Sequence, residues 1–229
     1  MGELKRQVLG DASGAVGHLV FRIKGKKNII AQRPVKKENP PVPSDAILAR
    51  RERFRLTGSV AAVINKTGAL SEIWPTPGEN LGSRFNEIFK KNFSTIGSIE
   101  NLGDAQLIPS FGITLMNAAI TLTSTTVTVA ADQFGSSAFI DSEKEKFLVA
   151  EGIVILSTPL NPESPKFLVL PIKSGLQSMD TDTPISITHT FSAGEATAFA
   201  AYTNKKVFLT LLTLTAGGVP VHFTEQVKY

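Results

Sequence analysis

Apolar residues near the start of the chain alternate with polar or basic residues over positions 19–24, and a second apolar run covers positions 28–31. Alternation with a period of two is typical of a strand, and a short turn between two such runs predicts a β-hairpin. We therefore predict a hairpin with a basic tip over residues 19–31. Because an isolated hairpin is marginally stable in water, we expect it to pack on the body or on another chain.

Two later stretches have helical periodicity. The first covers residues 45–65, DAILARRERFRLTGSVAAVIN, for which either Ser44 or Asp45 is a good N-cap. In residues 82–93 the apolar side chains fall on one helical stripe that begins at Leu81. The lone Trp74 lies in the turn-rich connection between them, and we interpret it as a packing anchor.

From about residue 106 onward the pattern is that of strands. Runs rich in Thr, Val, Ile and Leu recur with Gly, Pro, Asp or Asn between them, which indicates antiparallel strands joined by turns. We predict a mainly β fold: an antiparallel β-sandwich of seven or eight strands, immunoglobulin-like or jelly-roll, with an extended basic N-terminal arm and one or two helices. The expected strands cover residues 120–131, 152–159, 166–173, 185–191, 196–203, 206–216 and 219–227.

Prolines mark the first boundary between segments. Residues 32–43 contain four prolines in twelve positions, which favours an extended spacer because proline fixes its own φ and disfavours helix in the preceding residue. We expect residues 1–43 to form the basic arm with its hairpin and spacer. Residues 44–100 then form a helical connecting segment, and residues 101–229 form the β-sandwich.

Charge is divided unevenly along the chain. Residues 1–55 carry 13 Lys and Arg against 5 Asp and Glu, net +8, whereas the other 174 residues carry 11 against 15, net −4. A basic arm on a mildly acidic body fits two partners: nucleic-acid phosphates, or the acidic surface of a neighbouring subunit. The charge alone does not separate them.

The candidate site residues are the basic side chains of this first part. The arginines of the predicted helix suit phosphates or carboxylates, but a solvated helix face explains them equally well. The glycines ahead of the hairpin permit positive φ or close backbone approach, and their spacing does not match a nucleotide-binding loop. The candidates for assembly or phosphate binding are Arg22, Lys24, Lys26, Lys27, Arg33, Lys36, Lys37, Arg50, Arg51, Arg53 and Arg55, and the candidates for backbone turns are Gly10, Gly14, Gly17 and Gly25.

No residue pattern indicates an enzyme. The chain has no cysteine, so disulfides and thiolate metal sites are excluded. His18, His189 and His222 are isolated in the sequence, and we expect His189 to face the core and His222 to face solvent. The acidic residues 141–145 and the pair Asp180 and Asp182 lack the spacing of a calcium loop. We predict no catalytic residue, no metal and no cofactor.

Apolar runs are too short and too often interrupted for a membrane span, which takes about 20 residues. The opening MGELKRQVLGD has no apolar stretch behind its charges, so we expect no secretory signal and no membrane partner. We expect the protein to act in a virion or in an assembly formed in the cytoplasm.

The run GAVGHLVFRIKGKKNIIAQRP, followed by a proline-bearing spacer and ARRERFRLTGSVAA, resembles an uncharacterised domain family of bacteria and their phages. In that family a Gly-rich segment leads into a basic hairpin ending in Arg-x-x-Pro or a near variant, then an R/Q-x-R-F helix and a β-rich body. The resemblance covers residues 10–65 and implies an architecture rather than a reaction. The matching positions are Gly14, Gly17, Gly25, Arg33, Pro34, Arg51, Arg53 and Phe54.

The function that fits these features is that of a structural subunit of a phage-like virion or other protein particle. It would assemble with copies of itself and other particle proteins through its N-terminal arm. The alternative is a nucleic-acid-binding protein that neutralises phosphates with the arm and the arginine-rich helix. A surface-adhesion or carbohydrate-binding sandwich is a third possibility, weakened by the missing signal and the single tryptophan.

Overall fold

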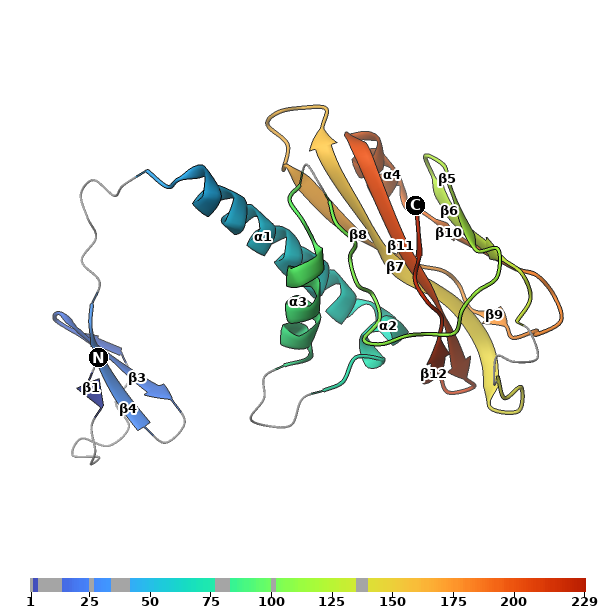
Figure 1. Ribbon diagram of the computed structural model, residues 1–229, viewed down its shortest axis with the longest axis horizontal. Helices are drawn as coiled ribbons and strands as arrows, with labels where there is room; N and C mark the ends of the chain where they lie inside the picture. Colours follow the sequence, from blue (N-terminus) through green and yellow to red (C-terminus); the bar gives the residue numbers. More distant parts are fainter. Residues whose placement is uncertain are drawn as a thin grey trace. The chain divides into compact units, whose positions relative to one another are not determined.

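The computed structural model describes residues 2–3, 14–24, 27–33, 42–76, 83–99, 102–134 and 140–229. The chain divides into two compact units, Met1–Ser44 and Asp45–Tyr229. Each unit has its own sheets (Figure 1).

The N-terminal unit is an antiparallel sheet with the strand order β1-β4-β3-β2. The predicted hairpin is confirmed, because β3 and β4 pair along their whole length. Val16 pairs with Leu19, so Gly17 and His18 form a two-residue turn between β2 and β3, and Gly17 has φ of +58° there. The strands are β1 (Gly2–Glu3), β2 (Gly14–Val16), β3 (Leu19–Lys24) and β4 (Lys27–Gln32).

The second unit contains two further antiparallel sheets and four helices. One sheet has the order β10-β6-β5; the other has the order β12-β11-β7-β8, with β13 beside β11 and β9 beside β7. The helices are α1 (Asp45–Lys66), α2 (Gly68–Glu72), α3 (Arg84–Thr95) and α4 (Ala193–Ala200). The strands are β5 (Ala119–Leu122), β6 (Thr126–Ala131), β7 (Glu145–Pro159), β8 (Phe167–Lys173), β9 (Gln177–Ser178), β10 (Ile185–Thr190), β11 (Tyr202–Thr215), β12 (Pro220–Phe223) and β13 (Val227–Lys228).

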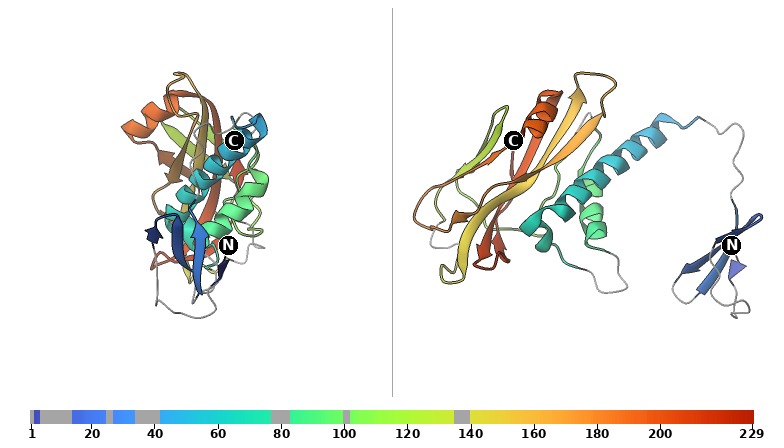
Figure 2. Two further views of the ribbon diagram at one scale, coloured as in Figure 1. Left: turned by 90° about the vertical axis from the view of Figure 1, so that its left-hand side faces the viewer. Right: turned by 180° about the vertical axis from the view of Figure 1, so that it is seen from behind.

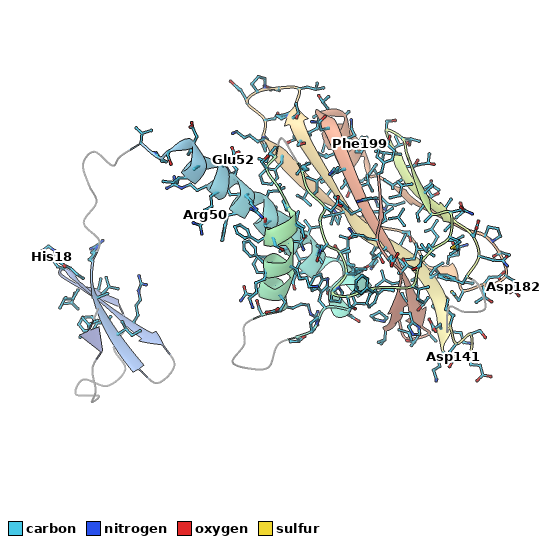
Figure 3. The ribbon with its side chains drawn as sticks, in the orientation of Figure 1. His18, Arg50, Glu52, Asp141, Asp182 and Phe199 are labelled. Carbon is cyan, nitrogen blue, oxygen red and sulfur yellow. The ribbon has the colours of Figure 1, made fainter. Side chains whose placement is uncertain are left out.

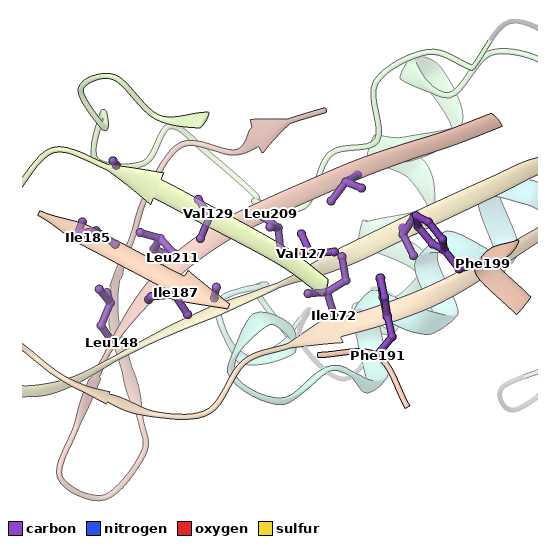
Figure 4. Packing of buried hydrophobic residues seen from close by; sticks show 14 of the residues in the cluster. Val127, Val129, Leu148, Ile172, Ile185, Ile187, Phe191, Phe199, Leu209 and Leu211 are labelled. Carbon is purple, nitrogen blue, oxygen red and sulfur yellow. The ribbon is translucent and has the colours of Figure 1, made fainter. Parts of the chain in front are cut away.

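The larger sheet is covered on both faces (Figures 1 and 2). Side chains of β7 alternate between the faces, so that Val154 and Leu156 pack against the three-stranded sheet while Ile153 and Ile155 pack against the helices. Figure 4 shows the first of these clusters, with Phe199 of α4 at one end. The centre of β7 therefore reads as a continuous apolar run because neither of its faces meets water.

Helix α1 is exposed in its first half and buried in its second. Its buried side chains begin at Leu56 and continue through Val60 to Ile64, on the stripe that faces β7 and β8. Trp74 is confirmed as a packing anchor: it is 2 % exposed, and its Nε1 donates to the carbonyl of Leu107 at 2.8 Å. Helices α1 to α3 thus share one core with the large sheet.

One predicted strand is wrong. Residues 196–203 were expected to be extended, but most of them belong to α4, and β11 begins only at Tyr202. A capping box starts the helix: Ser192 Oγ accepts from the backbone N–H of Glu195, whose carboxylate accepts from the backbone N–H of Ser192. The three alanines after Glu195 then favour helix.

The mainly β class and the antiparallel pairing are confirmed. The predicted helices at 45–65 and 82–93 are found within two residues of their expected ends as α1 and α3. The expectation of one or two helices is wrong, since the described residues form four. None of these helices is long and apolar enough to cross a membrane, as far as the described ranges extend.

Candidate functional site

The N-terminal sheet has no buried side chain among those described, residues 14–22 and 29–33. All three side chains of β2 are exposed, and Val16 at the sheet edge is 71 % exposed. Leu19 of β3 is 44 % exposed. Among the described strands β2 pairs only with β3, so its other edge offers backbone groups that no described strand pairs with, and such an edge is the usual point of attachment for a further strand.

The described basic candidates of this unit lie on or directly after its central strands. Arg22 of β3 and Arg33, directly after β4, are exposed, and the backbone N–H of Arg33 donates to the carbonyl of His18 at 2.6 Å. Lys24 ends β3 and Lys27 begins β4. Outside the described residues lie Lys26, Pro34, Lys36, Lys37, Gly10, Gly25 and most of the expected spacer.

The glycines that are described take the backbone conformation that only glycine adopts easily. Gly14 has φ of +120° and Gly17 has φ of +58°. Nothing lies within 4 Å of a Cβ atom added to either glycine, so the backbone conformation and not crowding explains the residue type. Both glycines belong to the β2–β3 hairpin.

Three of the four arginines in the first half of α1 form an exposed group. Arg50, Arg51 and Arg55 are exposed and make no hydrogen bond or ion pair with the described part of the chain. Figure 3 marks Arg50 and Glu52 on this part of the helix. Glu52 does not neutralise the arginines, because its carboxylate pairs with Lys166 in the β7–β8 loop. This arginine face, defined as Arg50, Arg51 and Arg55, keeps its positive charge available to a partner.

Arg53 is not part of the arginine face. Its guanidinium lies 4.7 Å from the ring centroid of Phe93 on α3, and its Nη2 donates to the carbonyl of the same residue. The neighbouring Phe54 contacts Phe89 of α3, with ring centroids 4.8 Å apart. Arg53 therefore joins α1 to α3, and the sequence spacing that grouped it with Arg50 did not reveal this contact.

Beside the arginine face is a hollow of about 650 Å³ between α1 and the β7–β8 loop. Arg55 lines it together with Gly58 and Phe167. Glu52 and Lys166 also line it, and they are already paired with each other. Among the described residues that line this hollow, Arg55 is thus the basic side chain without an ion-pair partner.

The histidines do not form a catalytic group. His189 is half-buried on the face expected from the sequence; its Nδ1 lies 2.8 Å from the carbonyl of Lys173, and its Nε2 has no partner. His222, 40 % exposed, lies 3.2 Å from the buried carboxylate of Glu145. His18 is exposed in the β2–β3 turn. No three His, Asp or Glu side chains of the described chain come close enough together to hold a metal ion.

The acidic residues considered for calcium form local turns instead. Asp141 pairs with Lys144 at 3.0 Å, and this hydrogen bond, with that from the Glu143 N–H, lowers the pKa of the Asp141 carboxyl below its usual value. Asp180 accepts from the N–H of Asp182 at 2.9 Å. Each carboxylate stabilises a bend in its own loop.

Two carboxylates were missed by the sequence reasoning as structural residues. Glu145 and Glu151 are each 1 % exposed, and both lie on β7. Glu145 accepts from the backbone N–H of Asp141, while its Oε2 has no partner in the described part of the chain. An acidic residue beside an apolar run is the only sequence signal for either position.

The edge of the N-terminal sheet at β2 and the arginine face of α1 are thus the candidate contact surfaces for the predicted partners. No family model matches the sequence, and no curated protein matches it.

Proposed function

We propose that the chain is a structural subunit of a phage-like virion or other protein particle, which assembles through its N-terminal arm, residues 1–43. The observation that carries the proposal is the absence of buried side chains among those described in the N-terminal sheet. A unit of this size gains little from burial and pays the full conformational entropy of ordering, so it needs a second surface. A neighbouring subunit provides such a surface at every position of a regular particle.

The edge of the sheet supports the same role. Strand β2 has exposed side chains and an edge that no other described strand covers, so a strand of a neighbour can extend the sheet by backbone hydrogen bonds. Charge supports a copy of the same chain as the neighbour, because the first 55 residues carry net +8 and the remainder net −4. The arm of one subunit is attracted to the body of the next.

The proposal also includes the arrangement of the two sheets of the second unit. We expect the two sheets that share the core of Figure 4 to form an immunoglobulin-like or jelly-roll sandwich. The basic arm then extends from the helical segment, residues 44–100, to a neighbour. The role requires no catalytic residue and no cofactor, and the site of action is the virion or an assembly in the cytoplasm.

Light scattering behind a sizing column tests the proposal, at low and high salt and after nuclease treatment. We expect a nuclease-resistant oligomer of fixed stoichiometry for the whole chain. Removing residues 1–43 should abolish assembly of the particle and leave a folded body, because the core of the second unit lies outside the deleted segment. A truncated protein that keeps the mass per particle of the whole chain would contradict the proposal.

The arginine face favours a second candidate, a nucleic-acid-binding protein. Three guanidinium groups on one helix, with no ion-pair partner among the described residues, suit phosphates, and each phosphate contact steepens the fall of log affinity with log salt by about 0.7–0.9. Changing Arg50, Arg51 and Arg55 together to Gln should then reduce that slope by about 2–3. A monomer that carries nucleic acid and releases it in salt would favour this candidate.

A further inference from the structure

Phe111 is the most exposed of the large apolar side chains described in the second unit, at 95 %. It lies in the loop of residues 107–113, which connects the helical segment to the β strands. Exposing a whole phenyl ring to water is unfavourable, and aromatic side chains are enriched at the centres of protein interfaces. We therefore expect another protein surface to cover the ring.

The loop that carries Phe111 is held in place at its start. The backbone of Leu107 is bonded on both sides: its carbonyl accepts from Trp74 Nε1 at 2.8 Å and its N–H donates to Gln226 Oε1 at 3.1 Å. Lys91 Nζ donates to the carbonyl of Pro109 at 2.9 Å. These three bonds link the loop to α3, to the segment after α2 and to the C-terminal strands.

The end of the loop is held as firmly. Ile113 exchanges two hydrogen bonds of 2.9 Å with the backbone of Phe223 and Glu225. Gly112 lies so close to the backbone of Thr224 that an added Cβ would meet its carbonyl carbon at 2.3 Å. A side chain presented from such a fixed loop loses little entropy when it is buried by a partner.

A hollow lies directly beside the ring. Its volume is about 360 Å³, and Phe111 itself forms part of its wall. Ile108 and Pro109 provide apolar lining, whereas Lys91 and Glu225 provide one charge of each sign. Both charged side chains are exposed, and neither has an ion-pair partner in the described ranges.

We propose that this surface is a two-fold contact between two copies of the chain, in which Phe111 of each copy enters the hollow of the other. A two-fold axis pairs a surface with itself, so a projection beside a hollow is complementary to its own copy. The same operation brings Lys91 of each copy to Glu225 of the other, which satisfies both charges. The choice of a second copy as partner rests on the proposed assembly function, but the contact is separate from the arm.

Phe111→Glu in the whole chain tests the contact, with Leu160→Glu as the matched control. Leu160 lies in the β7–β8 loop and is 70 % exposed, so both substitutions place a carboxylate on an exposed apolar position without disturbing a core. We expect F111E to raise the dissociation constant of the two-fold contact by at least about 30-fold, as for a central interface aromatic, and L160E to leave it unchanged. Sedimentation over a dilution series measures both.

Charge reversal tests the pairing itself. K91E and E225K should each weaken self-association, because each places two like charges together at both ends of the contact. Mixing the two variants should restore a dimer of one copy of each, since every facing pair then has opposite charges. An intramolecular effect of either substitution cannot produce this complementation.

The outcomes separate this contact from the arm. An oligomer that keeps its mass in F111E but dissociates on loss of residues 1–43 overturns the two-fold contact and leaves the assembly function in place. A dimer that survives loss of the arm and dissociates in F111E supports the contact. If the whole chain also forms nothing larger than this dimer, the arm's role is contradicted. If Phe111 instead anchors a different protein, none of the substitutions changes the mass of the purified chain, and the proposal fails.

Discussion

The carboxylate of Glu151 accepts a hydrogen bond of 2.6 Å from the backbone N–H of Leu70. The two residues are 81 positions apart, on β7 and α2, and the carboxylate is 1 % exposed. Lys173 lies 3.5 Å from the other carboxylate oxygen. The helical segment is therefore attached to the large sheet by a polar contact as well as by its apolar core.

Replacing Glu151 by Ala should lower the free energy of unfolding by about 1–3 kcal/mol, because the buried N–H of Leu70 loses its acceptor. Glu151→Gln should cost less, since an amide oxygen can still accept this bond. Urea denaturation measures both, with the exposed Glu163→Gln as the control. Equal stability of E151A and the wild-type protein would show that water replaces the carboxylate.

Gly152 is a position where a side chain does not fit. It lies between β11 and β8, and an added Cβ would meet the carbonyl oxygen of Phe208 at 2.0 Å. We expect Gly152→Ala to lower the free energy of unfolding by about 2 kcal/mol or more, because strands β7 and β11 must move apart. Gly175→Ala is the control, since nothing lies within 4 Å of its added Cβ, and it should remain within about 0.5 kcal/mol of wild type.

Arg53 and Arg51 should respond differently to the same substitution. Arg53→Gln removes both the contact with the Phe93 ring and the hydrogen bond to the Phe93 carbonyl, and should lower the free energy of unfolding by about 1–2 kcal/mol. Arg51→Gln removes only an exposed charge, so denaturation in urea should be nearly unchanged. A similar loss for both variants would refute the distinction between Arg53 and the arginine face.

Stability should depend on pH through the cap of α4. Burial alone raises the pKa of the Glu195 carboxyl, but the N–H and Oγ of Ser192, each 2.8 Å away, donate to it and, with His189, lower the pKa overall. A carboxyl whose pKa falls on folding adds stability above its unfolded value, here 4.5, and this gain disappears as the pH falls through the folded value.

The melting temperature of the wild type should fall between neutral pH and pH values below 4.5. For Glu195→Gln this fall should be smaller. Ser192→Ala removes the same cap from the other side and should lower the melting temperature at neutral pH, by the equivalent of about 1 kcal/mol. Melting followed by circular dichroism at each pH measures both. Parallel pH curves for E195Q and wild type would contradict the role of this carboxyl.

Local pattern was sufficient for much of this fold. The hairpin of β3 and β4, the helices α1 and α3 and most body strands follow from periodicity and turn residues, because each is specified within its own segment. Helix α4 was missed although Ser192 and Glu195 form the S-x-x-E signature of a capping box. The alternation of small residues after it fits a strand as well as a helix.

The candidate site depended more on contacts between distant segments. Arg53 and Arg50 are equivalent in sequence spacing, and only the packing of α3 against α1 assigns Arg53 to a contact with Phe93. Phe111 likewise follows the apolar residues Leu107 and Ile108, a pattern typical of a buried residue, yet its side chain is 95 % exposed. No sequence pattern within either segment indicates the contact of Arg53 with α3 or the exposure of Phe111.

Strands β7 and β11 form a wall common to two cores, with Ile153 on one side and Val154 on the other. Neither core can lose its packing while the other remains intact, because both depend on the same backbone ladder. We therefore expect the second unit to melt in one cooperative transition, despite having two hydrophobic clusters. Partly unfolded forms that expose an apolar sheet should then be rare, which limits aggregation of the chain.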